Sequence, residues 1–178
     1  MSTPITVQDI YRRIRDVPDF PKPGIVFKDI TPLLLDAVAF RRAVELMAAP
    51  FQGAKVTRVV SIESRGFLLG APIALALDAG LVPIRKPGKL PAERGRVEYA
   101  LEYGTDALEM HRDAMSPADR VLVVDDVLAT GGTAGAAAQL VRSRGATVAG
   151  FTFLLELDFL KGRTRLSGER VEALLHYA

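Results

Sequence analysis

The segment VLVVDDVLATGGT, residues 121–133, decides the fold class. It opens with an apolar, mostly β-branched run, as in a strand that is buried on both faces of a sheet. Two acids, Asp125 and Asp126, end this strand, and a loop of small residues then opens an alanine-rich helix. A buried strand that leads through a short loop into a helix is the repeating unit of a parallel α/β sheet.

The rest of the chain repeats this alternation. Strands are expected at TRVVSI (57–62), LVPIRK (81–86), RVLVVDD (120–126) and TVAGFTFLLEL (147–157), and helices at about 6–15, 36–49, 67–79 and 132–144. Pro72 fits only the first turn of a helix, and Gly145 should end the last helix. The pattern predicts a single α/β domain, residues 1–178, with an open, mostly parallel twisted sheet and helices on both faces. In such sheets ligands bind beyond the carboxyl ends of the strands.

Composition excludes several classes of protein. With 178 residues, 49% hydrophobic and 25% charged, the chain is typical of a soluble globular protein. The net charge of +2 is too small to indicate a nucleic-acid or membrane-surface binder. The absence of cysteine excludes disulfides, zinc fingers and thiol catalysis. The most apolar stretch, residues 68–84, is shorter than the about 20 residues of a membrane span, and no secretory signal is present, so a cytoplasmic protein is expected.

The loop after Asp126 has the composition of a phosphate site. Its uncovered backbone N–H groups would converge on a phosphate at the start of a helix. These loop residues are Ala129, Thr130, Gly131, Gly132 and Thr133. Asp125 and Asp126 would repel a phosphate, so they suit the vicinal hydroxyls of a ribose. A plain helix-capping turn after a strand end is the alternative. The motifs GxxxxGK[ST], GxGxxG and GxSxG are missing, which disfavours nucleoside triphosphatases, dinucleotide oxidoreductases and nucleophile-elbow hydrolases.

A basic segment, residues 85–96, has five bases against one acid, a local net charge of +4 in a chain of only +2. The bases are Arg85, Lys86, Lys89, Arg94 and Arg96. Together with Pro87, Gly88 and Pro91, they favour a lid loop that closes over a multiply charged anion. A solvated loop kept mobile by like charges is the alternative. Arg65, just after strand 57–62, would clamp a diphosphate, or else pair with Glu63 or another acid.

Residues 121–133 resemble the 5-phosphoribosyl-1-pyrophosphate (PRPP) motif of the type I phosphoribosyltransferase family. The resemblance extends to DFPKPGIVFKDITPLL (19–34), ESRGFLLG (63–70), IRKPGKLP (84–91), YALEYG (99–104) and LELDFLKGR (155–163), in the order and spacing of members that use adenine. It implies the type I fold, with an N-terminal helix and base-binding hood at about 1–35 and a lid at about 86–104. The implied reaction converts adenine and PRPP to AMP and pyrophosphate, by an oxocarbenium-like displacement at ribose C1. A homodimer is implied, as is Mg²⁺ held mainly through the pyrophosphate of PRPP, with no direct protein ligand.

The resemblance also assigns roles to single residues. PRPP and AMP would be bound by Asp125, Asp126, residues 129–133, Arg65, Arg85, Lys86 and Lys89, and the bond between Glu63 and Ser64 would be cis. Adenine would be held by Val26, Phe27, Lys28 and Leu157. Without the resemblance, a phenylalanine after a proline-rich turn, such as Phe27, is more often a core anchor. Many members have arginine in place of Lys28, which leaves open whether its side chain or its backbone contacts the base.

The catalytic set is predicted to be Arg65, Glu102 and Tyr103. Glu102 would accept a proton or hydrogen bond from the purine, and Tyr103 would order the closed lid; a solvated loop acid is the alternative for Glu102. Two rival functions stay open: transfer to hypoxanthine, xanthine or orotate, and a regulator that senses purines without catalysis. The blocks at 19–34 and 99–104 favour adenine, and no helix-turn-helix precedes the first proline-rich turn, which disfavours the regulator.

Overall fold

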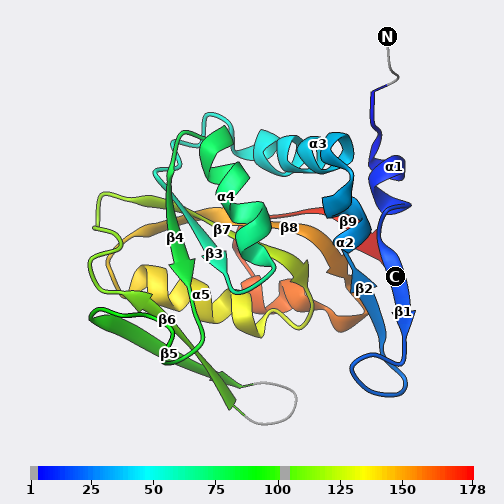
Figure 1. Cartoon of the computed structure of the whole chain (residues 1–178). Coiled ribbons are helices and arrows are strands. Elements are labelled where there is room, and N and C mark those ends of the chain that lie inside the picture. The colour runs from blue at the N-terminus through cyan, green and yellow to red at the C-terminus, as the bar shows by residue number, and fades with distance from the viewer. Residues whose placement is uncertain (1–3, 101–104) are drawn as a thin grey trace. The chain divides into compact units, whose positions relative to one another are not determined.

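The computed structural model describes residues 4–100 and 105–178, and the chain divides into two compact units, Met1–Leu46 and Met47–Ala178 (Figure 1). The first unit contains helix α1 (Val7–Tyr11), strands β1 (Arg15–Pro18) and β2 (Val26–Asp29), helix α2 (Thr31–Leu35) and most of helix α3 (Ala37–Ala48). The second unit contains all the other elements.

Helix α1 begins with the capping box expected at Thr6 and Asp9. It ends at Tyr11, earlier than expected, because the chain turns into β1, which pairs antiparallel with β2. Cross-strand ion pairs, Arg15 with Asp29 and Lys28 with Asp16, follow this register. The proline-rich residues between the strands form the predicted turn, in which Asp19 accepts a hydrogen bond from the backbone N–H of Gly24 at 2.8 Å.

The second unit is built on a five-stranded sheet in the order β4-β3-β7-β8-β9, and every pairing in it is parallel. The strands are β3 (Arg58–Ile62), β4 (Gly80–Ile84), β7 (Arg120–Leu128), β8 (Thr147–Leu157) and β9 (Val171–Tyr177). The first four confirm the strands expected from sequence, and each end lies within two residues of the expected one. The open parallel α/β sheet is therefore confirmed, while β9 was not foreseen.

Two helices of this unit, α4 (Gly66–Ala76) and α5 (Gly132–Arg142), lie on opposite faces of the sheet (Figure 1). Successive side chains of β3 point alternately toward α4 and toward α5. Ser61 lies against Gly70 of α4, where an added Cβ would come within 2.3 Å of the serine hydroxyl. Val60 and Ile62 belong to the core cluster that α5 also joins. Such two-sided burial explains why the strands read as continuously apolar.

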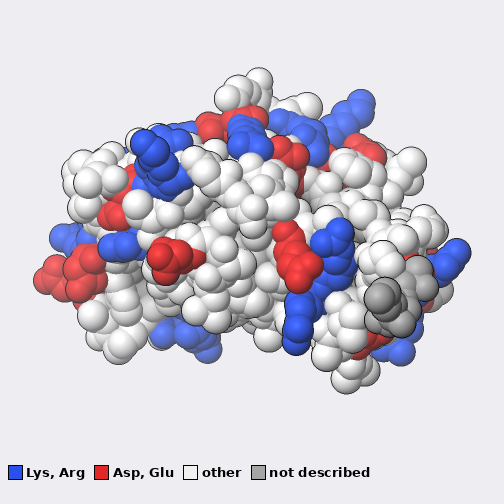
Figure 2. Space-filling model, turned by 90° about the horizontal axis from the view of Figure 1, so that it is seen from above, with Lys and Arg blue, Asp and Glu red and all other residues white. Residues whose placement is uncertain are grey.

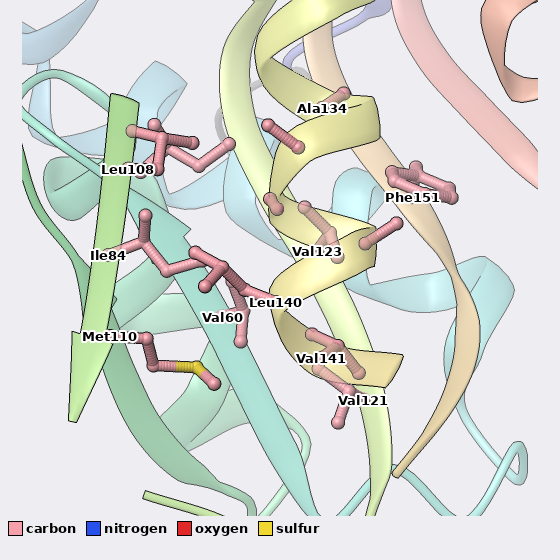
Figure 3. Close-up of a cluster of buried hydrophobic side chains, with 14 of the residues drawn as sticks. Val60, Ile84, Leu108, Met110, Val121, Val123, Ala134, Leu140, Val141 and Phe151 are labelled. Carbon is pink, nitrogen blue, oxygen red and sulfur yellow. The ribbon is translucent and has the colours of Figure 1, made fainter. Parts of the chain in front are cut away.

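The main core of the second unit lies between α5 and the sheet. Figure 3 shows Val121 of β7 close to Val141 of α5, and Val123 of β7 and Phe151 of β8 belong to the same buried cluster. The alanines of α5 allow the helix to pack closely on the sheet, because a methyl side chain leaves the least space between the two backbones.

Pro72 is inside α4 rather than in its first turn, so the expectation for this residue was wrong. An interior proline removes one backbone hydrogen bond and strains the preceding turn. The helix continues because its inner face is fully packed: Leu69 and Ile73, on either side of the proline, are both 0% exposed. Burial of an apolar face outweighs the poor helix propensity.

Strands β5 (Arg94–Ala100) and β6 (Thr105–His111) form an antiparallel hairpin next to α5. Residues 94–100 lie in the segment expected to be a lid loop, but they form a strand. The reason is an alternation that the charges obscure: Arg94, Arg96 and Glu98 are exposed, whereas Val97 and Tyr99 pack against the core. Three short 3₁₀ helices, at Ala49–Phe51, Asp158–Leu160 and Gly162–Leu166, complete the fold.

Charges of both signs are mixed on the face of the molecule that Figure 2 shows, with no field of a single sign. This agrees with the small net charge of the chain. Among the helices of the described residues, none is both long and apolar enough to cross a membrane.

Candidate active site

The strand order reverses between β3 and β7. The chain leaves β3 through α4 toward β4, and it leaves β7 through α5 toward β8 on the other side. Ligands of open α/β sheets bind at such a switch point, outside the carboxyl ends of the strands. Glu63, Ser64 and Arg65 directly follow β3, and the acids Asp125 and Asp126 lie in the last part of β7. The expected cis peptide bond between Glu63 and Ser64 is confirmed.

The loop from β7 to α5 is held by two glycines. Gly131 caps α5 with a φ of +79°, a conformation that residues with a side chain rarely adopt, and an added Cβ would lie 2.4 Å from the carbonyl oxygen of Gly162. A Cβ on Gly162 would in turn lie 2.2 Å from the carbonyl oxygen of Ala129. The loop therefore packs directly on the backbone of the last 3₁₀ helix. Sequence analysis missed Gly162, although its block, 155–163, had been singled out.

The loop encloses a small hollow of about 70 Å³, lined by Asp125 and residues 127–134. Its lining includes all five residues predicted to bind phosphate, from Ala129 to Thr133. The backbone N–H groups at the start of α5 have no partner within the first turn of the helix, which makes this end of the helix attractive to an anion. The structure therefore places the five residues of the predicted phosphate loop around one hollow.

Asp125 lines this hollow, and the adjacent acid, Asp126, follows it in β7. Burial, together with the neighbouring charge of Asp126, raises the pKa of Asp125 well above its ordinary value. Burial also raises the pKa of Asp126, and the charge of Arg65 opposes that effect. The Nε atom of Arg65 lies 2.9 Å from Oδ2 of Asp126, so the acid that pairs with Arg65 is Asp126 and not Glu63.

Glu63 instead pairs with the first base of the basic segment. Its Oε2 accepts a hydrogen bond from Nε of Arg85 at 2.6 Å and one from the backbone N–H of Lys86 at 2.9 Å. Burial opposes the charge on Glu63, but these bonds outweigh it and hold the pKa of the carboxyl below its usual value. Arg85 also lies over the ring of Phe67, in α4. Arg65 and Arg85 are thus fixed by two acids at the same switch point.

The basic segment carries less free charge than its own sequence indicates, because acids from other elements neutralise it. Glu109 in β6, 3% exposed, binds Arg94 and accepts a hydrogen bond from the backbone N–H of Gly88. Asp106 in the same strand pairs with Lys86. Lys89 is exposed, and its charge helps to lower the pKa of Glu63.

The predicted adenine contacts lie in both units. Val26, Phe27 and Lys28 form most of β2, and Leu157 ends β8. The ring of Phe27 contacts Phe20 edge-on, at 5.1 Å between centroids, within the first unit. The side chain of Lys28 binds Asp16 at 2.6 Å. The two remaining catalytic candidates, Glu102 and Tyr103, fall outside the described residues.

Comparison with known proteins identifies the class to which this fold and site belong. The phosphoribosyl transferase domain family matches residues 34–166, so the chain belongs to the phosphoribosyl transferase family and is a transferase. Its sheet and helices match the type I fold of solved members, as the sequence predicted.

Within that family the chain groups with the adenine phosphoribosyltransferases of purine salvage. It is 63% identical over 171 residues to adenine phosphoribosyltransferase of Myxococcus xanthus, an alignment that covers 96% of this chain and 93% of the relative. The crystal structure of the enzyme from Thermoanaerobacter pseudethanolicus superposes with a TM-score of 0.94 at 52% identity, covering 97% of this chain and 100% of that one. The Saccharomyces cerevisiae enzyme, solved with an imino-altritol bisphosphate and adenine, gives a TM-score of 0.90 at 39% identity and covers 95% and 98%.

Proposed function

We propose that this protein transfers the phosphoribosyl group of PRPP to adenine, giving AMP and pyrophosphate. The observation that carries the proposal is the meeting of a glycine-containing loop at the start of α5, two adjacent acids and two ion-paired arginines at one switch point. A plain helix-capping turn, the alternative for this loop, needs neither the two acids nor the two arginines. The high identity to adenine phosphoribosyltransferases supports adenine as the base.

The ligand's parts are assigned by charge. The loop at residues 129–133 takes the 5′-phosphate, because its N–H groups and hydroxyls are donors at the start of a helix. Asp125 and Asp126 accept hydrogen bonds from the ribose hydroxyls. Arg65, Arg85, Lys86 and Lys89 bind the pyrophosphate, for which guanidinium groups offer paired donors.

Magnesium is proposed to enter with PRPP rather than to occupy a protein cage. Asp125 and Asp126 provide oxygen atoms, the ligand type that Mg²⁺ prefers, but Asp126 is already paired with Arg65. Over the described part of the chain, the one cluster of three candidate ligands is Glu156, Asp158 and His176, outside this loop. An ion held by the pyrophosphate oxygens fits this donor set. When bound, it neutralises charge on the departing pyrophosphate.

The protein's own residues act on two charges that develop during the displacement at ribose C1. As the bond to pyrophosphate breaks, Arg65 and the basic segment stabilise the leaving group, because preorganised donors need no rearrangement. Glu102 is proposed to accept the proton or hydrogen bond of the incoming purine, and Tyr103 to order the lid. A closed lid excludes water, which would otherwise hydrolyse PRPP.

The adenine contacts stay a prediction from the family resemblance. Phe27 is proposed to stack on the base, and Val26, Lys28 and Leu157 to complete its surroundings. The ion pair between Lys28 and Asp16 favours a contact through the backbone of Lys28 rather than through its ammonium. A backbone contact would also tolerate the arginine that many members carry at this position.

A homodimer is proposed as well. Leu68 and Leu75 of α4 are 48% and 84% exposed, and an exposed apolar helix face favours association. Symmetric pairs are the commonest soluble oligomers. Light scattering on the wild type and on Leu75→Glu tests this, since a monomeric wild type contradicts it. The cytoplasmic location stays a prediction from the sequence.

The decisive experiment is a transfer assay with Mg²⁺, PRPP and one base at a time. We expect adenine to yield AMP and pyrophosphate, and hypoxanthine, guanine and orotate to react far more slowly. Faster turnover with another base would reassign the substrate. PRPP binding without turnover of any base would favour the purine-sensing regulator instead.

A further inference from the structure

Two residues to which no role is assigned above, Tyr99 and Asp106, belong to a hydrogen-bonded group that joins two parts of the site. The hydroxyl of Tyr99 in β5 accepts a hydrogen bond from Nζ of Lys86 at 3.3 Å and one from Oγ1 of Thr133 at 3.3 Å. It donates to Oδ2 of Asp106 at 3.3 Å, and Lys86 also bonds Asp106 directly. One phenol oxygen offers one donor and two acceptor positions, so its capacity is fully used.

These four residues come from four separate elements. Lys86 follows β4, Tyr99 and Asp106 face each other across the β5–β6 hairpin, and Thr133 is in the first turn of α5. Tyr99 is the member of this group that contacts each of the other three. Its ring is partly buried against the core of the second unit, which fixes where its hydroxyl points.

The charges are arranged to keep Lys86 protonated and in place. Burial works against the ammonium, but its bonds to Asp106 and Tyr99 raise the pKa of Lys86 above its usual value. Burial also works against the carboxylate, and the bond from Lys86 lowers the pKa of Asp106 below its usual value. Both groups therefore carry the charges that their ion pair needs at neutral pH.

We propose that Tyr99 and Asp106 are positioning residues that couple the 5′-phosphate site to the pyrophosphate site. The inference rests on the proposed function, in which Thr133 binds the 5′-phosphate and Lys86 binds pyrophosphate. The hydroxyl of Tyr99 is hydrogen-bonded to both residues. A ligand fragment that orders Thr133 thus also orders Lys86, and the second fragment then binds at a smaller cost in conformational freedom.

The test measures the coupling directly, by titration calorimetry of the full chain with Mg²⁺ present. Pyrophosphate affinity is measured alone and with saturating ribose 5-phosphate, and the ratio of the two is the coupling factor. We expect a factor of at least about 5 for the wild type. Tyr99→Phe keeps the ring but loses the hydroxyl, and should bring the factor close to 1 and weaken PRPP by about 10-fold.

Asp106→Asn gives a second, independent reading. Removal of an acid raises the positive potential at Lys86, so plain electrostatics predicts tighter pyrophosphate binding with unchanged coupling. The positioning role predicts lost coupling whatever happens to pyrophosphate alone. Glu98→Gln is the matched control, because Glu98 precedes Tyr99 in β5, is exposed and pairs with Arg96. In this variant the pyrophosphate affinity and the coupling factor should both stay at the wild-type value.

The outcomes separate this inference from the function on which it rests. A wild-type factor of 1, or an unchanged factor in both variants, overturns the coupling. If Tyr99→Phe lowers the melting temperature and Asp106→Asn does not, the coupling factor of Asp106→Asn decides whether the positioning role holds. If wild-type protein binds neither PRPP nor its two fragments, the proposed function itself fails, and the coupling with it.

Discussion

Arg65 and Asp126 form an ion pair of 2.9 Å across the ends of two neighbouring parallel strands, β3 and β7. Sequence reasoning assigned these residues to different parts of PRPP, the pyrophosphate and the ribose. Their contact means that the guanidinium is already oriented at the switch point, since a 5% exposed carboxylate cannot move far. Preorganised charge of this kind is what stabilises a leaving group without rearrangement.

Asp125→Asn should stabilise the fold while it weakens PRPP binding. The raised pKa of Asp125 means that the folded state holds this proton more tightly than the unfolded state does. The contribution to stability is present at low pH and is lost as the pH rises through the raised folded-state pKa. A neutral amide escapes this loss, so at pH 7 we expect the Tm to rise by about 2–4 °C, as roughly 1 kcal/mol gives in a domain of this size. Thermal melting at pH 7 and pH 4 checks it: the advantage should shrink at pH 4, and a lower Tm at pH 7 contradicts the argument.

Gly131→Ala should weaken PRPP binding strongly. Its φ of +79° strains any side chain by about 1–2 kcal/mol, and the new Cβ would lie 2.4 Å from the carbonyl of Gly162. We expect the affinity for PRPP to fall by about 100-fold or more, as for a loss of about 3 kcal/mol. Gly135→Ala is the control: it lies in the same helix with nothing within 4 Å of its Cβ, and it should bind PRPP normally and melt slightly later. Equal affinity in the two variants would show that the loop does not bind phosphate.

Asp29→Asn should lower the free energy of unfolding at pH 5. It should also make that free energy fall less steeply between pH 5 and pH 2 than in the wild type. Side-chain and backbone hydrogen bonds from Thr31, then Arg15, lower the pKa of Asp29 from 3.8 to about 2. A lowered folded-state pKa stabilises the protein above pH 3.8, and this contribution disappears as the pH falls through about 2. Urea unfolding from pH 5 to pH 2 measures the slope for wild type and variant. Asp113→Asn, at an exposed site, should leave the slope unchanged, and identical slopes for all three proteins would contradict the prediction.

Glu102→Gln should lower turnover more than it lowers affinity for PRPP. The amide keeps the size of the side chain but cannot take a proton from the purine, so the loss falls on kcat, by about 10²–10⁴-fold for a general base. Steady-state kinetics with adenine, together with PRPP calorimetry, distinguishes the two quantities. If PRPP affinity falls and kcat is retained, Glu102 contacts PRPP and is not the base. Glu98→Gln controls for the loss of an acid in the neighbouring strand.

Much of the parallel sheet followed from sequence because its strands, such as β7 and β8, are buried on both faces and therefore read as apolar runs. The strands that were missed are of another kind. In β5, charged residues alternate with Val97 and Tyr99, so a count of charge alone favours a loop over a strand. In β9, Glu172 and His176 interrupt the run. Pro72 was misjudged because local propensity says nothing about how well Leu69 and Ile73 are packed.

The site shows the same division. Asp125, Asp126 and the loop at residues 129–133 are contiguous, so one segment of sequence shows both their chemistry and their proximity. The partners of the basic segment, Glu109 and Asp106, are distant in sequence, and only the folded chain brings them near. A local count of charge therefore overstated the free positive charge at the lid. Gly162 was missed for the same reason, since its role exists only against Ala129 and Gly131.

The approach of Gly131 to Gly162 has a consequence for protein engineering. Two main chains touch there with no side chain between them, so the spacing has no adjustable part. A library that randomises both positions should therefore return glycine at each. Widening the hollow for a bulkier anion requires changes at Thr130, at Thr133 or in the β5–β6 hairpin instead. The proposed recognition of phosphate therefore depends on main-chain geometry at these two glycines, which side-chain substitutions elsewhere leave unchanged.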